Sequence, residues 1–183
     1  MLHILNGSRH FTLRNSVLKA ETVSASFGIN LFKMENTKKD EDGYNNDYVT
    51  IENNQLRGGY IALNISGTGY VALQKERGAV VRNNIVNNAG SKGIYLSDET
   101  DALLDNNTII SSETKKKSYI AIDVFRSKGR LVIRNNKIVN NQTAYSTGIN
   151  LRNEVSGTVE QPALVYNNSI ITKIGRASCR ERV

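Results

Sequence analysis

Short runs of alternating apolar and polar residues recur along the chain, and each run ends on a pair of asparagines. The clearest copy is Leu131-Val-Ile-Arg-Asn-Asn-Lys-Ile-Val-Asn140. Alternation with a period of two is typical of a half-buried β-strand. The other copies are Phe11-Thr-Leu-Arg-Asn-Ser-Val-Leu (with Ser16 in place of the second Asn), Val49-Thr-Ile-Glu-Asn-Asn-Gln-Leu, Ala79-Val-Val-Arg-Asn-Asn-Ile-Val, Ala102-Leu-Leu-Asp-Asn-Asn-Thr-Ile and Ala163-Leu-Val-Tyr-Asn-Asn-Ser-Ile.

The spacing of these copies predicts a solenoid. The first Asn of the pair falls at positions 15, 53, 83, 106, 135 and 167, at intervals of 38, 30, 23, 29 and 32 residues. The shortest interval fits one turn of three short strands, and the longer ones add loops. A second segment also recurs in most turns and predicts the third strand: Gly28-Ile-Asn-Leu, Tyr60-Ile-Ala-Leu, Gly93-Ile-Tyr-Leu, Tyr119-Ile-Ala-Ile and Gly148-Ile-Asn-Leu.

The Asn pair has a structural interpretation in this scheme. The first Asn is in step with the apolar residues, so we expect it to point inward and to form an amide ladder between coils about 4.8 Å apart. The second Asn would occupy the bend in a left-handed conformation, which Asn tolerates. The expected core residues are Ile51, Val81, Leu104 and Ile133 before the pair, Leu56, Val86, Ile138 and Ile170 after it, and Ile94, Leu96, Ile149 and Leu151 in the third strand.

One outward row supports this register. The position before the first Asn reads Arg14, Glu52, Arg82, Asp105, Arg134 and Tyr166 in successive copies. The first five alternate in sign, as expected for a surface ladder of neighbouring charges.

These repeats resemble the right-handed parallel β-helix superfamily, which has the pectin-lyase-like fold, from Leu2 to about Lys173. The resemblance implies an all-β solenoid of about six coils, three short strands each, with an internal Asn ladder. It also implies a secreted or cell-surface protein, and a substrate groove along the third strand in members that are enzymes.

Two outward rows on the third strand are therefore candidates for ligand binding. We expect Asn30, Ala62, Tyr95, Ala121 and Asn150 in one row, and Phe32, Asn64, Ser97, Asp123 and Arg152 in the next. Such a polar strip with an aromatic side chain suits sugar hydroxyls and carboxylates, so polysaccharide is the expected partner. The candidate ligand-binding residues are Lys92, Tyr95, Ser97, Asp98, Asp123, Arg126, Asn150 and Arg152.

Three functions remain open at this point. We expect a non-catalytic, elongated extracellular module that presents this face toward polysaccharide, with a structural stalk or adhesin segment as one alternative. A polysaccharide lyase acting on uronate-containing glycans is the other, with Lys92, Arg126 or Arg152 as base and Asp98, Glu99, Asp101 and Asp123 holding Ca²⁺. A hydrolase needs paired carboxylates. Only Asp98 and Asp123 would qualify, and the hydrolase motifs of the superfamily do not occur.

Cofactors and other partners leave few signals. Residues 40–47 form an acidic loop that resembles a calcium site without its full register. We therefore expect no metal site and no cofactor, and Ca²⁺ is the one candidate that stays open. Residues 115–117 are three lysines, interpreted as a solvated loop tip. The net charge of +7 is dispersed, so we expect no nucleic-acid partner.

The two ends suggest part of a longer chain. No secretory leader precedes the first copy, and no run of eighteen apolar residues predicts a membrane span. Residues 174–183 resemble a translated sequencing adapter, so we interpret them as a non-native tail that includes the one cysteine, Cys179. We expect a single β-helix domain over residues 1–173, truncated at both ends and continued by further coils.

Overall fold

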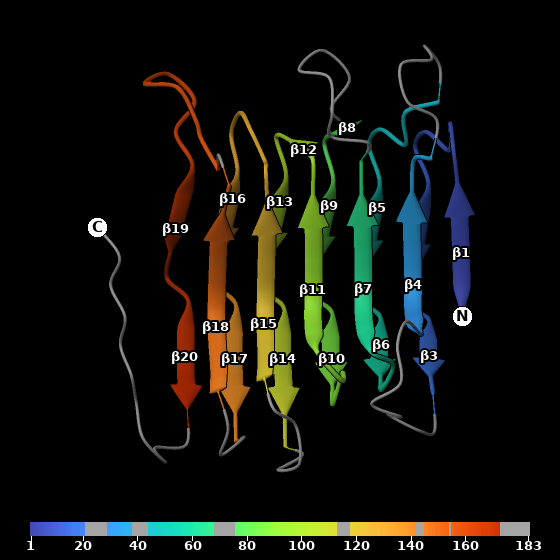
Figure 1. The fold of residues 1–183 in the computed structure, drawn as a ribbon, viewed down its shortest axis with the longest axis vertical. Helices are drawn as coiled ribbons and strands as arrows, with labels where there is room; N and C mark the ends of the chain where they lie inside the picture. The colour runs from blue at the N-terminus through green and yellow to red at the C-terminus, as the bar shows by residue number, and fades with distance from the viewer. Residues whose placement is uncertain are drawn as a thin grey trace.

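The chain folds into a parallel β-solenoid in a computed structural model, which describes residues 1–20, 29–37, 44–67, 76–112, 118–141, 145–153 and 155–172. Twenty strands form three six-stranded parallel sheets and one two-stranded sheet, with no helix among the described residues (Figure 1). Successive strands of each large sheet are one turn apart, so its six strands span about five turns. The predicted fold class is confirmed.

The first two sheets carry the Asn-pair repeat. The sheet before the pair contains β2 (Thr12–Arg14), β5 (Thr50–Glu52), β9 (Val80–Arg82), β13 (Leu103–Asp105), β16 (Val132–Arg134) and β19 (Leu164–Tyr166). The sheet after the pair contains β3 (Val17–Lys19), β6 (Gln55–Arg57), β10 (Ile85–Asn87), β14 (Thr108–Ser111), β17 (Lys137–Asn140) and β20 (Ser169–Thr172).

The third sheet, called the long sheet below, has the longest strands. It contains β1 (Leu2–Leu5), β4 (Asn30–Glu35), β7 (Ile61–Ser66), β11 (Lys92–Ser97), β15 (Ser118–Phe125) and β18 (Tyr145–Arg152). Two short strands, β8 (Glu76–Arg77) and β12 (Glu99–Thr100), pair in the connection between the long sheet and the next turn.

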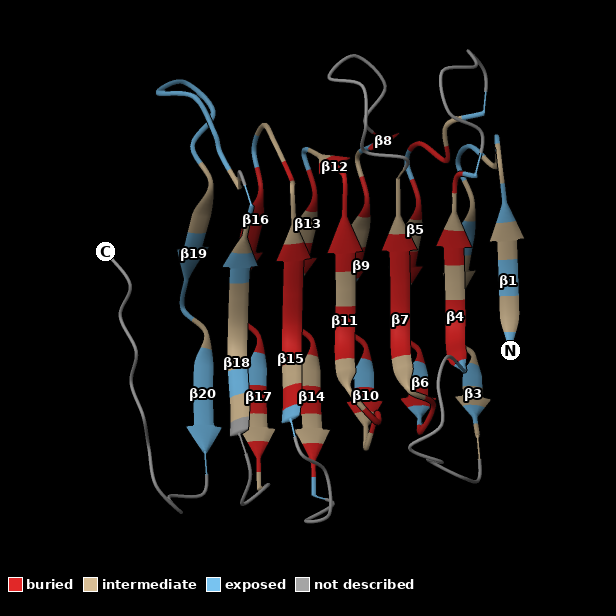
Figure 2. Ribbon diagram, viewed as in Figure 1, coloured by how far each residue is buried: buried red, intermediate tan, exposed pale blue. Residues whose placement is uncertain are grey.

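The core lies between the three sheets. The predicted core residues of β5, β9 and β13 are fully buried, and the first and last strands of each large sheet are the least buried (Figure 2). Two predicted core residues, Leu151 and Ile170, are 40 % and 47 % exposed. They lie in the last turn, where no following coil among the described residues packs on them.

The outward charge row has the predicted register. Glu52 pairs with both Arg14 and Arg82 as strand neighbours, and Asp105 pairs with both Arg82 and Arg134. Arg82 Nη2 lies 2.6 Å from Glu52 Oε2, and Arg134 Nη2 lies 2.8 Å from Asp105 Oδ2. At Tyr166, where the sign alternation stops, the hydroxyl accepts a hydrogen bond from Arg134 Nη1 at 3.2 Å.

The two asparagines of each pair have exchanged the roles that we predicted. Every first Asn is exposed and has a positive φ between 51° and 57°, while the second Asn is buried in four of the copies. The prediction was wrong because it extended the strand alternation through the bend. A left-handed residue reverses that alternation, so the residue after it points inward. The six left-handed residues are Asn15, Asn53, Asn83, Asn106, Asn135 and Asn167.

The second asparagines form the internal ladder, called the Asn row below. Asn84 shows the pattern: its backbone N–H donates to Asn107 Oδ1 at 3.1 Å, and its Nδ2 donates to Asn107 Oδ1 at 3.0 Å and to Ile51 O at 2.8 Å. Each buried amide is therefore satisfied from both neighbouring coils. The row comprises Asn54, Asn84, Asn107, Asn136 and Asn168, with Ser16 donating to Asn54 at its start.

The register of the third strand also differs from the prediction. Asn64, Tyr95, Asp123 and Asn150 lie side by side, with Lys33 at the start of the row. The next outward row contains Glu35, Ser66, Ser97, Phe125 and Arg152. In β7 and β15 the shift is two residues, which keeps every apolar side chain on the same face, so the apolar pattern did not fix this register. In β4 the shift relative to β7 is one residue, so Phe32 lies beside Leu63 and points inward. Four residues assigned to outward rows, Asn30, Phe32, Ala62 and Ala121, are instead buried.

Candidate functional site

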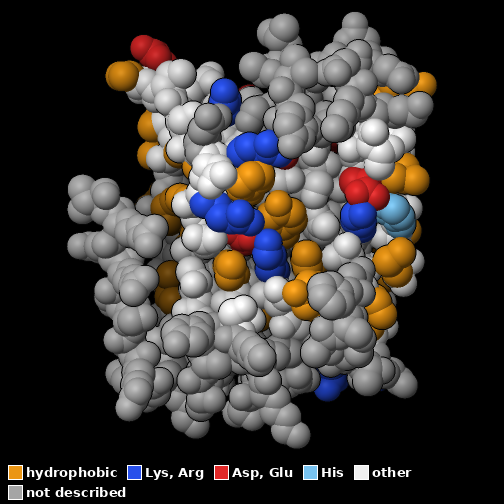
Figure 3. Space-filling view, viewed as in Figure 1, with side chains coloured by type: hydrophobic (Ala, Val, Ile, Leu, Met, Phe, Trp, Pro, Cys, Tyr) orange, Lys and Arg blue, Asp and Glu red, His pale blue; other side chains and the backbone are white. Residues whose placement is uncertain are grey.

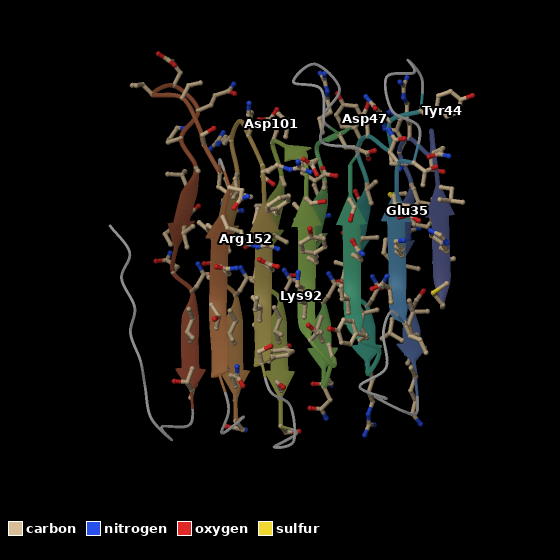
Figure 4. The ribbon with its side chains drawn as sticks, in the orientation of Figure 1. Glu35, Tyr44, Asp47, Lys92, Asp101 and Arg152 are labelled. Atoms are coloured by element: carbon tan, nitrogen blue, oxygen red, sulfur yellow. The ribbon has the colours of Figure 1, made fainter. Side chains whose placement is uncertain are left out.

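The outer face of the long sheet carries a group of cationic and aromatic side chains, called the basic–aromatic cluster below. Basic side chains gather with hydrophobic ones near the middle of this face (Figure 3). Lys92 on β11 and Arg152 on β18 lie on either side of β15 (Figure 4). The cluster comprises Lys92, Tyr95, Asp98, Asp123, Phe125, Arg126, Asn150 and Arg152.

Asp123 is the centre of this cluster. Its side chain is fully buried, and Lys92 Nζ lies 2.5 Å from its Oδ2. Arg152 donates to both carboxylate oxygens, from Nε and Nη2 at 3.0 Å each, and Asn150 Nδ2 donates to Oδ1 at 2.9 Å. Burial raises the pKa of Asp123, but the hydrogen bonds from Arg152 and Lys92 outweigh it and hold the pKa below its usual value. Asp123 is therefore a charged anchor for two cations.

A second ion pair lies at the end of the same strands. Arg126 Nη2 donates to Asp98 Oδ2 at 3.0 Å, and the Asp98 side chain is 2 % exposed. Arg126 has a φ of 50°, a left-handed conformation that is uncommon for a long side chain. The guanidinium of Arg126 lies 4.5 Å from the Phe125 ring centroid, and that of Arg152 lies 4.7 Å from it. Phe125 thus joins the two ion pairs through cation–π contacts.

Tyr95 completes the cluster on the side of β11. Its ring lies 3.9 Å from Lys92 Nζ and occupies the row between Asn64 and Asp123. Ser97, the remaining candidate, is 5 % exposed and is the strand neighbour of Phe125. All eight candidate residues therefore lie on β11, β15, β18 or the turns that follow β11 and β15. The structure does not bring Asp101 into an ion pair or hydrogen bond with this cluster among the described residues.

The chemistry of this arrangement is charge pairing around buried carboxylates. An ionised carboxylate held by an arginine and a lysine is a poor proton donor at neutral pH. The guanidinium of Arg152 is likewise a poor base, because its hydrogen bond to Asp123 raises its pKa further. In the described part of the chain, no group of three or more His, Cys, Asp or Glu side chains is placed to hold a metal ion.

The loops singled out by the sequence add little to this site. In the acidic loop, residues 40–43 lie outside the described residues, and Asp47 approaches Arg9 with an oxygen-to-nitrogen distance of 3.8 Å. The three lysines at 115–117 and the tail at 174–183 also lie outside the described residues.

Two residues were not predicted from the sequence, Phe125 and Glu76. Phe125 was not selected, because the third strand was aligned two residues out of register. Glu76 was overlooked, although it lies inside the solenoid beside Glu99. A positional signal could have found it: residues 8, 46, 76 and 99 each lie seven positions before the first Asn at 15, 53, 83 and 106.

Comparisons with known proteins agree with this architecture. Among the described residues, no helix has the length and apolar character needed to cross a membrane. No curated protein and no solved structure matches the chain. The sequence model described as the right-handed β-helix region matches residues 4–177, so the chain belongs to the right-handed β-helix family.

Proposed function

We propose that the protein is a non-catalytic extracellular β-helix module that binds polysaccharide through the basic–aromatic cluster of the long sheet. The observation that carries this proposal is the combination of Tyr95 and Phe125 with three cations on one regular surface. Parallel strands repeat their side chains at the spacing of the coils, so the surface extends along the solenoid and suits an extended chain.

The ion pairs favour binding over catalysis. Lys92 and Arg152 are held on Asp123, and Arg126 is held on Asp98. A lyase would need one of these basic residues to accept a proton from the substrate. Each of these side chains already donates to a buried carboxylate, and its remaining N–H groups can still donate to hydroxyl or carboxylate oxygens of a ligand.

The unusual conformation of Arg126 supports the same assignment. The other positive-φ residues at this turn position are Asn6, Asp98 and Asn153, residue types that tolerate positive φ better than arginine. An arginine at this position costs about 1 kcal/mol more in backbone strain. Its side chain contacts both Asp98 and Phe125, which is consistent with selection for the surface that it forms.

The proposal is tested by binding to immobilised glycans, including uronate polymers, with the Tyr95→Ala variant. We expect Tyr95→Ala to weaken binding about tenfold, because a stacking aromatic contributes about 1 kcal/mol or more. Tyr166→Ala is the matched control, since Tyr166 is 38 % exposed on a different sheet and should leave binding unchanged. Equal loss in both variants, or no binding by the unmodified chain, would contradict the proposal.

A spectroscopic screen separates binding from lyase activity. Elimination in a uronate polymer creates a double bond conjugated to the carboxylate, and this product absorbs short-wavelength ultraviolet light. We expect no increase in absorbance when the protein is incubated with uronate polymers, with or without Ca²⁺. A steady increase that Lys92→Ala abolishes would establish the lyase alternative instead.

A further inference from the structure

A second internal row runs along the corner between the long sheet and the next turn, and is called the mixed row below. Ser8 N–H donates to Asn46 Oδ1 at 2.9 Å, and Asn46 N–H donates to Glu76 Oε2 at 3.0 Å. Glu76 pairs with Glu99 through β8 and β12, and the bridge between Thr100 and Lys128 places Ser127 next. The side chains of Asn46 and Glu76 thus accept backbone hydrogen bonds from the preceding coil as in the Asn row, but two members of this row are carboxyls.

These two carboxyls are buried without enough partners. Glu76 is 0 % exposed and Glu99 is 1 % exposed. Glu76 Oε1, both carboxyl oxygens of Glu99 and the Ser127 hydroxyl have no hydrogen-bond partner among the described residues. A buried ionised carboxylate without a partner is unfavourable by several kcal/mol, so such groups take up a proton.

The surrounding charges do not offset this burial. The nearby acidic groups are Asp47 in the segment before β5 and Asp98 in the turn after β11, and both raise the pKa of Glu99. Two nearby cations are directed at these aspartates and not at the glutamates: Arg126 pairs with Asp98, and Arg9 approaches Asp47. Arg77 and Lys128, the basic residues beside the row on β8 and in the next coil, form no ion pair with Glu76 or Glu99.

We propose that Glu76 and Glu99 form a pH-operated lock, in which two uncharged carboxyls hold the corner between the long sheet and the following turn closed and their ionisation favours its opening. The lock acts locally, because β8 and β12 contribute only two residues each to their sheet. The neighbouring long strands are held by much longer ladders, so the corner is the part of these coils that opens first.

The titration of the pair gives the direction of the effect. Burial raises the pKa of Glu76 to about 8 and raises that of Glu99 well above its usual range. Below about pH 4.5 both carboxyls are protonated in the closed and open states, so the closed state is most favoured there. As pH rises toward 8 the open state releases protons that the closed state still holds, and opening becomes progressively easier.

Hydrogen exchange measured by mass spectrometry at several pH values between 5.5 and 7.5 tests the lock. After correction for intrinsic exchange, we expect the opening constant of peptides covering residues 44–49, 76–81 and 97–103 to rise about tenfold per pH unit for each carboxyl, or about a hundredfold for the pair. Peptides of the Asn row around residues 104–109 contain no such group and serve as the internal control.

The variants Glu76→Gln and Glu99→Gln separate the two contributions. Each single variant should reduce the rise of the opening constant to about tenfold per pH unit, since glutamine is isosteric with the protonated acid and does not titrate. The double variant should show no pH dependence at this corner. A corner whose protection is independent of pH in the unmodified protein would overturn the proposal. So would a dependence that persists in the double variant, or one shared equally by the Asn row.

Discussion

The Asn row and the mixed row share one backbone geometry and differ in their side chains. In both, a backbone N–H of one coil donates to a side-chain oxygen of the next, at 3.1 Å for Asn84 to Asn107 and 3.0 Å for Asn46 to Glu76. The amide of Asn also donates, so the Asn row satisfies itself in both directions. A carboxyl has no such pair of donors, and oxygens of Glu76 and Glu99 remain without partners.

An internal ladder of a β-solenoid needs both a donor and an acceptor on every rung. Neutral amides supply one acceptor and two donors per rung, which matches the groups that the stacked backbones leave free. Carboxyls fit the same space but depend on a proton to remain buried. The Asn row is therefore expected to stabilise the fold at every pH, and the mixed row only while it is protonated.

The largest expected effect comes from removing one rung of the Asn row. Asn107→Ala should lower the free energy of unfolding by about 3 kcal/mol, because it leaves the buried Asn84 N–H and Val81 C=O of the preceding coil without these partners. Asn106→Ala is the matched control: it removes an exposed hydrogen bond to Asn83 Oδ1 and places alanine at a φ of 52°, so a loss of about 1 kcal/mol is expected. Urea denaturation measures both, and equal losses would contradict the assignment of the ladder to the second Asn.

The smallest expected effect comes from the outward charge row. Glu52→Gln should change the free energy of unfolding by about 0–1 kcal/mol, because Arg82 is half exposed and its ion pair is screened by solvent. The change should shrink further in high salt. Denaturation midpoints in low and high salt measure it. A loss as large as that of Asn107→Ala would mean that the outward row, rather than the internal one, holds the coils together.

The sequence predicted the solenoid because the alternation around Ile51, Val81 and Leu104 is regular and the Asn pair marks every turn. It assigned the wrong Asn to the interior, because alternation alone does not reveal which residue of a bend is left-handed. It misaligned β7 and β15 with β11, because a shift by two residues preserves the apolar face.

The sequence predicted most residues of the candidate site, but it did not predict how their side chains are arranged. Lys92, Asp123 and Arg152 were each selected, but their meeting depends on the register of three neighbouring strands. The burial of Glu99 was not foreseen, because an acidic residue beside a turn is ordinarily exposed. Its position seven residues before Asn106 was the available signal, and its meaning became clear only from the row that it joins.

The contrast between the two rows is tested most directly by the pH dependence of unfolding. We expect the free energy of unfolding to fall by about 2.7 kcal/mol more between pH 5.5 and 7.5 in the unmodified chain than in Glu76→Gln, because one additional proton is released over two pH units. Asn84→Ala should lower stability by the same amount at both pH values. Parallel pH profiles for the unmodified chain and Glu76→Gln would contradict the claim that Glu76 is buried as an uncharged acid.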